Sequence, residues 1–220
     1  MIRKLIATAA MSICPLIAVT SCATNPDNRK EENITQNKTT MKTDGKKLVV
    51  FFSHTGENYG VGYIEKGNTH VIADMIADKT GADRFEIVPV NGYPKDSYND
   101  CVEVAKREKE SNARPPIKGD VKVEDYDVVF IGYPNWWGEP PMCVFTFIEQ
   151  HDWKGKTVIP FITHEGSGMG GTDRKIAAAC KGADVAIGNG FAIQGKVAQN
   201  DRETAAKNVD RWLKSLGLTF

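Results

Sequence analysis

Three polar stretches of the sequence carry the side chains best suited to binding a ligand. The first begins at residues 53–56 (SHTG) and resumes at residues 67–69 (GNT), where a helix is expected to start. Hydroxyl groups, an amide and backbone N–H groups at a helix start can bind a phosphate without a lysine. The GxxxxGK(S/T) pattern of nucleoside-triphosphate sites is not present. This stretch therefore predicts a phosphate site, or else only a helix capped by Asn68 or Thr69.

The second stretch, residues 133–141 (YPNWWGEPP), contains two adjacent tryptophans, Trp136 and Trp137. Flanked by proline and glycine, they cannot both lie inside an ordinary helix or strand. An indole offers a flat face on which an aromatic ring can stack. Two alternatives remain open: one tryptophan covers the end of a sheet, or both contact a partner protein.

The third stretch, residues 163–171 (THEGSGMGG), formally satisfies the GxGxxG pattern of dinucleotide-binding proteins. The pattern follows the fourth apolar run of the chain, whereas a dinucleotide site has it after the first strand. We therefore expect these glycines to let backbone amides approach the polar edge of a ring. His164 and Glu165 are candidates to contact the same ligand.

The remaining reactive residue types predict no metal site and no catalytic residue. The four histidines are scattered, and no nucleophile elbow or Ser-His-Asp arrangement is recognisable. Balanced charge, with 28 basic and 28 acidic residues, argues against non-specific nucleic-acid binding. Of the five cysteines, three (Cys101, Cys143 and Cys180) lie beyond residue 46. Because an odd number argues against a disulfide framework, we expect mainly buried thiols.

Five apolar runs are expected to form the strands that position these polar stretches. Residues 48–52, 128–131 and 158–162 are continuously apolar, as in parallel strands covered on both faces. Residues 84–87 alternate in polarity and residues 185–193 are interrupted by glycines, which is typical of edge strands.

Amphipathic segments separate the strands. They predict helices after Thr69, over residues 98–111, 140–150 and 172–181, and at residues 205–216. Five strands alternating with five helices predict an α/β three-layer sandwich whose five-stranded parallel sheet has the order 2-1-3-4-5. In such a sheet a ligand binds beyond the carboxyl ends of the first and third strands, where the three polar stretches are expected to meet.

The first 46 residues are expected to lie outside this domain. Arg3 and Lys4 precede an apolar run of 15 residues, 5–19, which is too short to span a membrane but suits a signal peptide over residues 1–21. The sequence VTSC at residues 19–22 resembles the lipobox of bacterial lipoproteins, in which Cys22 is acylated; an ordinary signal peptide is the alternative. Residues 22–46 are polar and predict a flexible tether, so that residues 47–220 form the domain.

Taken together, the three stretches resemble the flavodoxin family, in particular bacterial flavodoxin-like proteins with YPxWWG and xGSGxG loops. Flavodoxin is itself the standard example of the sheet order 2-1-3-4-5. The resemblance covers roughly residues 47–195. It is carried by Ser53, Thr55, and residues 67–69, 85–87, 112–115, 132–138 and 163–168.

The resemblance implies non-covalent binding of FMN. It assigns the phosphate to Ser53, Thr55, Asn68 and Thr69. It places the isoalloxazine beside Pro134, Asn135, Trp136, Trp137 and Gly138, with one of the two indoles stacked on the ring. It brings the other edge of the ring to Thr163, His164, Gly166, Ser167 and Gly168.

Two features depart from the family pattern. The phosphate loop of flavodoxins is usually continuous, whereas residues 57–67 are inserted here, and Tyr59 and Tyr63 within them either cover the ring or pack on the surface. Carrier flavodoxins are usually strongly acidic. Without residues 1–21 this chain keeps 26 basic and 28 acidic residues, a net charge of −2.

Three functions are compatible with these features. The first is an FMN-binding electron-transfer protein, lipid-anchored to the bacterial cell envelope and facing the periplasm or the surface, whose partner is a redox protein. The second is an FMN-dependent NAD(P)H:quinone-type oxidoreductase, with a quinone and a nicotinamide as partners. The third is an interaction module that has lost its flavin and presents its tryptophans to a partner protein.

Overall fold

The computed structural model describes residues 42–218. The predicted signal peptide, Cys22 and most of the predicted tether lie outside these residues. None of the helices in the described part combines the length and the apolar character that crossing a lipid bilayer requires.

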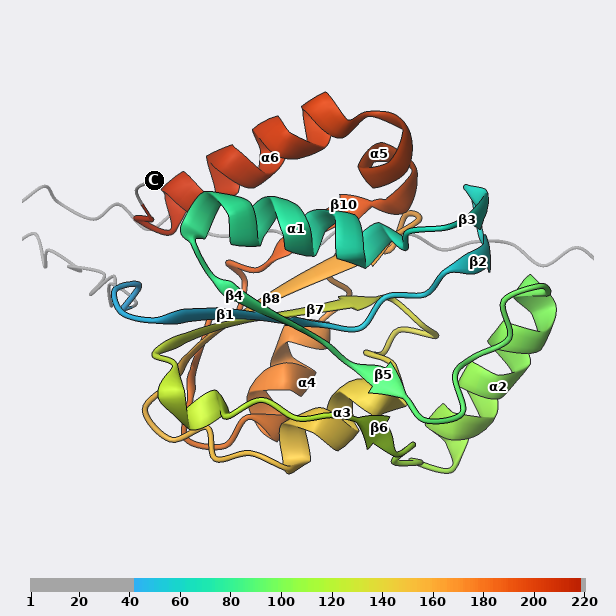
Figure 1. Ribbon diagram of the computed structural model, residues 1–220, viewed down its shortest axis with the longest axis horizontal. Helices are drawn as coiled ribbons and strands as arrows, with labels where there is room; N and C mark the ends of the chain where they lie inside the picture. Colours follow the sequence, from blue (N-terminus) through green and yellow to red (C-terminus); the bar gives the residue numbers. More distant parts are fainter. Residues whose placement is uncertain (1–41, 219–220) are drawn as a thin grey trace, which may run out of the picture. The chain divides into compact units, whose positions relative to one another are not determined.

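A parallel sheet forms the middle layer of the domain (Figure 1). Its main strands, in spatial order, are β10 (Phe191–Gln194), β8 (Thr157–His164), β7 (Val128–Pro134), β1 (Lys47–Phe51) and β4 (Asp83–Glu86). Numbered along the chain as predicted, this order is 2-1-3-4-5, which confirms the expectation. The prediction that residues 185–193 form a single fifth strand is wrong. The region is divided into β9 (Asp184–Val185) and β10, which both pair with β8, so that the sheet has six strands.

Helices cover both faces of the sheet (Figure 1). One face carries α1 (Asn68–Thr80), α5 (Gly195–Asn200) and α6 (Arg202–Ser215). The other carries α2 (Tyr98–Glu110), α3 (Met142–Glu149), α4 (Thr172–Ala179) and the 3-10 turn η1 (Val123–Asp125). All five predicted helices are present, and α5 is an additional one. Helix α3 begins after Pro140 and Pro141, later than predicted, because a residue that precedes proline disfavours helical geometry.

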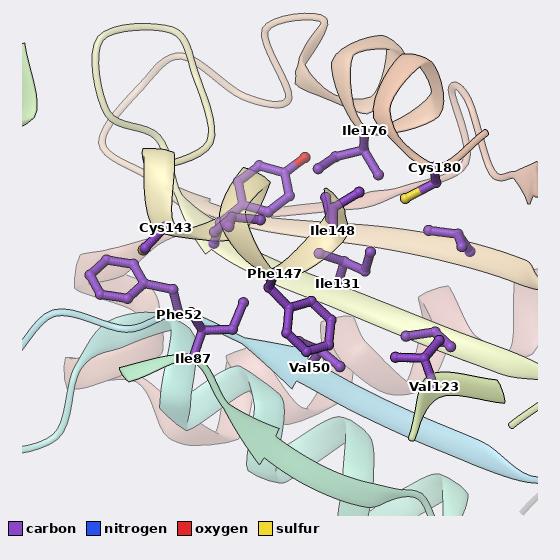
Figure 2. Close-up of a cluster of buried hydrophobic side chains, with 14 of the residues drawn as sticks. Val50, Phe52, Ile87, Val123, Ile131, Cys143, Phe147, Ile148, Ile176 and Cys180 are labelled. Carbon is purple, nitrogen blue, oxygen red and sulfur yellow. The ribbon is translucent and has the colours of Figure 1, made fainter. Parts of the chain in front are cut away.

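The continuous apolar runs are buried on both faces, as predicted. Along β1, Leu48 and Val50 face the cluster under α3 and α4, whereas Val49 and Phe51 face the cluster under α1 and α6. Figure 2 shows the first cluster, in which Phe147 packs among aliphatic side chains. These two clusters hold the strands, and therefore their carboxyl ends, in a fixed register.

The three cysteines are buried free thiols, which confirms the expectation from their number. Burial raises the pKa of the Cys101 thiol to about 12 and that of Cys143 still further. Thiols with so high a pKa carry almost no thiolate at neutral pH and are therefore unreactive.

Two short antiparallel pairs were not predicted. The inserted residues form a β-hairpin from β2 (Gly56–Asn58) and β3 (Gly62–Ile64), with positive φ at Gly60 in the turn and at Gly62, the first residue of β3. A second pair joins β5 (Val88–Pro89) to β6 (Ile117–Lys118). The hairpin is important for the site because it joins the two parts of the first polar stretch, residues 53–56 and 67–69.

Gly132 of β7 gives a test of the central packing. It pairs with Phe161 of β8, and a Cβ at position 132 would lie 2.0 Å from Cζ of this buried ring. We expect Gly132→Ala to lower the free energy of unfolding by about 1–3 kcal/mol, because an overpacked core must shift. Urea denaturation measures this change.

The Phe161→Leu background is the control. Without the phenyl ring, the added methyl group has space, so Gly132→Ala should cost clearly less there. An equal cost in both backgrounds would show that the strain arises elsewhere.

Candidate functional site

The three predicted stretches converge at the carboxyl ends of β1, β7 and β8. An inner hollow of about 150 Å³ is lined by residues of all three: Asn68 from the first, Pro134, Asn135 and Trp136 from the second, and Thr163, His164 and Glu165 from the third. An outer hollow of about 260 Å³ adjoins it on the side of α2 and shares Asn58, Tyr98, Asn135 and Trp136 with it. The sequence therefore identified the right edge of the sheet.

The first stretch is built around the start of α1. Ser53 Oγ accepts a hydrogen bond from the backbone N–H of His70 at 3.0 Å, which ties the end of β1 to the helix. Gly67 is the N-cap, so the prediction of Asn68 or Thr69 as the cap was wrong. A Cβ on Gly67 would lie 2.2 Å from Ser53 Oγ and 2.4 Å from the His54 carbonyl oxygen. Only glycine fits this contact.

The predicted phosphate residues have different roles. Thr69 is buried, and its hydroxyl lies 2.8 Å from that of Thr163, so it joins the first stretch to the third. Thr55 is half-buried and lines neither hollow. Asn68 has a buried Oδ1 atom that lacks a hydrogen-bond partner within residues 42–218. Of the four residues, Asn68 offers the clearest unused group.

The backbone at the start of α1 also offers donors. The first four N–H groups of a helix have no intrahelical acceptor. Here Ser53 Oγ accepts a hydrogen bond from the N–H of His70. The first bond of the helix runs from the Val71 N–H to the Gly67 carbonyl, at 3.2 Å. Within the described residues, the N–H groups of Asn68 and Thr69 have no acceptor and lie at the positive end of the helix dipole. This arrangement fits an anion.

The two tryptophans are held differently. The Trp136 ring packs edge-on against Tyr93 at 4.8 Å and Phe52 at 5.3 Å, so it closes the end of the core while lining both hollows. Trp137 is 49% exposed, and its Nε1 donates to the Val102 carbonyl at 3.2 Å. Its φ is +57°, in the left-handed region, and it lines only the outer hollow. Trp136 is therefore the indole that a ligand in the inner hollow contacts.

Asn135 fastens the second stretch to the third. Its Nδ2 donates to Ser167 Oγ at 2.5 Å, and its Oδ1 accepts from the Gly138 N–H at 2.8 Å. Ser167 and Gly138 line neither hollow, and they serve to hold the loops.

Within the third stretch, Thr163 and His164 line the inner hollow, whereas Gly166 and Gly168 do not. The Gly166 N–H donates to His164 Nδ1 at 2.9 Å, and burial lowers the pKa of the imidazole. A neutral imidazole whose Nδ1 accepts carries its proton on Nε2. His164 can thus donate a hydrogen bond to a ligand.

The sequence did not single out Asn58 and Tyr98 as site residues. Tyr98 begins α2, and its ring centroid lies 5.9 Å from that of Tyr59 on the hairpin. Asn58 and Tyr59 come from the inserted residues and line the inner hollow, whereas Tyr63 is exposed and lines neither. The hairpin thus forms one wall of the site. No pattern in the sequence relates it to α2, because the two are brought together by tertiary contacts.

Two contacts fix the hairpin across the site. On the side of α2, the Glu57 N–H donates to the Lys95 carbonyl at 2.7 Å. On the side of β8, a Cβ on Gly60 would lie 3.2 Å from the Glu165 carboxyl carbon. Glu165 Oε1 in turn accepts from the Lys196 N–H at 3.0 Å, and burial raises the pKa of this carboxyl group.

Comparisons with known proteins agree with this geometry. The family description flavodoxin matches residues 46–209. Among proteins with curated descriptions, none matches. A putative flavoprotein from Bacteroides eggerthii is 29% identical, with 80% of this chain and 100% of that chain covered and a TM-score of 0.62.

Two further solved structures are similar. A putative flavoprotein from Bacteroides uniformis is 27% identical, with 77% of this chain and 98% of that one covered and a TM-score of 0.59. A Lactobacillus acidophilus flavoprotein, solved in complex with FMN, is 20% identical and has a TM-score of 0.51, with 77% of this chain and 99% of that one covered. Since the family match spans most of the described domain, this chain belongs to the flavodoxin family.

Proposed function

We propose that this protein binds FMN non-covalently where the three loops meet, with its ring at the inner hollow, and transfers electrons through it. One observation carries the proposal: residues of three separate loops line a single hollow at the edge where β1 and β7 diverge into their loops. The donor set suits the cofactor. An anion-binding helix start and a buried acceptor on Asn68 lie on one side, and an indole on the other. FMN is also the ligand of the Lactobacillus acidophilus flavoprotein.

The chain would hold the parts of FMN with different groups. The N–H groups of Asn68 and Thr69 bind the phosphate, and Asn68 Oδ1 accepts from a ribityl hydroxyl. Trp136 contacts the ring, and His164 donates from Nε2 to its polar edge. FMN supplies the electron chemistry, whereas the protein positions it and excludes water.

The outer hollow favours a second candidate function. It adjoins the inner hollow and has a volume of about 260 Å³. An FMN-dependent oxidoreductase must bind a small-molecule substrate beside the flavin, and this hollow would provide room for one or two rings. Electron transfer is common to both functions.

Flavin retention and turnover test these functions. We expect the purified protein to keep FMN through desalting and to oxidise NADH or NADPH slowly without a partner reductase. A colourless protein would leave the interaction module as the function. Rapid steady-state oxidation of NADH or NADPH with an added quinone would replace the carrier by the oxidoreductase.

Trp136 is expected to matter more than Trp137 for FMN affinity. Trp136→Leu should weaken binding by about 1–3 kcal/mol, on the scale of base–aromatic stacking. Trp137→Ala, the matched control, should change affinity less, because Trp137 does not line the inner hollow. Quenching of FMN fluorescence measures both, with circular dichroism to check folding. A larger loss in Trp137→Ala would reverse the assignment.

We also propose that the protein is lipid-anchored to the cell envelope through Cys22. Support comes from the apolar run and the VTSC sequence before the polar residues 23–46. Stable anchoring requires more than one acyl chain, as lipoprotein processing provides.

In a bacterial host, Cys22→Ser should move the protein from the membrane fraction to the soluble fraction. Cys14→Ser, within the apolar run, is the control and should leave it in the membrane fraction. Partitioning of the protein into the detergent phase shows whether acyl chains are attached. Membrane association that survives Cys22→Ser would contradict the proposal.

A further inference from the structure

Helix α5, which the sequence did not predict, contacts two of the three loops of the site. It begins at Gly195, directly after β10, and packs beside α1 (Figure 1). Near its end, Gln199 Nε2 donates to the Lys66 carbonyl at 2.6 Å, which holds the residue before the N-cap of α1. At its start, the Lys196 N–H donates to Glu165 Oε1, which holds the loop after β8. The junction of β10 and α5 is therefore a fourth segment beside the site.

Gly195 itself lies against the side chain of Asn68. A Cβ at position 195 would lie 2.1 Å from Asn68 Nδ2 and 2.8 Å from Asn68 Cγ. The same Cβ would lie 2.6 Å from Glu165 Oε1. The missing side chain of Gly195 thus leaves the space that the Asn68 amide occupies.

The backbone conformation does not explain this glycine. Gly195 is the first residue of α5, and its φ does not lie in the left-handed region. Alanine favours a helix more than glycine does, so helix formation alone would select alanine here. What requires glycine at position 195 is therefore the close approach of the Asn68 and Glu165 side chains.

The contact also determines how the Asn68 amide is oriented. An asparagine amide carries its donor, Nδ2, and its acceptor, Oδ1, on different sides of Cγ. Nδ2 is the end that lies nearest to Gly195, and the carboxylate of Glu165 beside it is an acceptor, which favours the donor end at this place. Gly195 and Glu165 thus hold the amide in one orientation before any ligand binds, which reduces the conformational entropy lost on binding.

We propose that Gly195 is a positioning residue for flavin binding, because it fixes the orientation of the Asn68 amide. A side chain at position 195 turns this amide and removes its contact with the ribityl chain. Asn68 lines the inner hollow whereas Gly195 does not, so Gly195 acts through Asn68. The contact between Asn68 and the flavin rests on the proposed function; the fixed orientation of the amide does not.

Gly195→Ala tests this role with three flavins. The variant should bind FMN and riboflavin about threefold to tenfold more weakly, the contribution of one hydrogen bond. Lumiflavin has the ring without the ribityl chain, so its affinity should be the same for the variant and the unaltered protein. Quenching of flavin fluorescence measures all three affinities. Asn200→Ala, an exposed change at the other end of α5, is the control and should alter none of them.

A double-variant cycle assigns the loss to Asn68. In an Asn68→Ala background the Nδ2 and Cγ atoms are missing, so Gly195→Ala should weaken FMN binding further by less than about twofold. A further loss as large as that in the unaltered protein would show that Gly195 acts through Glu165 or through the backbone of α5, and would contradict the proposal.

Flavin-free protein makes a second test independent of the proposed function. In a ¹H–¹⁵N spectrum, Gly195→Ala should move the side-chain amide signals of Asn68, which are identified by their absence in Asn68→Ala. Asn200→Ala should leave these signals in place. If Gly195→Ala does not fold, the unaltered protein decides: nuclear Overhauser contacts should join the Nδ2 protons of Asn68 to the α protons of Gly195.

Four results would overturn the proposal: unmoved Asn68 amide signals, no Overhauser contact with Gly195, an unchanged FMN affinity in Gly195→Ala, or an equal loss of affinity for lumiflavin. A protein that takes up no flavin at all removes the proposed function and the flavin contact of Asn68. The amide signals of the flavin-free protein still decide whether Gly195 fixes Asn68.

Discussion

The parallel pairing of β1, β7 and β8 is the constraint on which the site depends. Backbone hydrogen bonds fix Phe51 beside Gly132 and Pro134 beside Thr163, so the three strands end at the same edge of the sheet. Because both faces are buried, a slip of one residue would exchange the two core clusters. The loops that follow the strands therefore have little freedom in where they begin.

Contacts between the loops set the rest of the geometry before any ligand binds. The Thr69–Thr163 and Asn135–Ser167 hydrogen bonds tie the third loop to the other two, and Ser53 holds the first loop to α1. Several residues that the family pattern assigns to the cofactor thus have a structural role here. A site held in this way loses little conformational entropy on binding.

The inserted hairpin changes the character of the site relative to the expected flavodoxin pattern. It adds Asn58 and Tyr59 to the wall of the inner hollow and closes the gap between α2 and the loop after β8. Trp136 lines both this inner hollow and the outer one beside α2, as do Asn58, Tyr98 and Asn135. The arrangement provides a polar, anion-binding side at α1 and an apolar side at α2.

The sequence by itself determined the order of the main strands of the parallel sheet and the edge where the loops meet, because hydrophobic periodicity reports burial directly along the chain. It did not determine the division of the fifth strand or the short antiparallel pairs. Through the family pattern it also predicted six cofactor residues that line the inner hollow: Asn68, Pro134, Asn135, Trp136, Thr163 and His164. Only the tertiary structure decided which indole faces the inner hollow and that Gly67 caps α1. These outcomes depend on contacts between residues far apart in the sequence, such as Thr69 and Thr163, which no local pattern encodes.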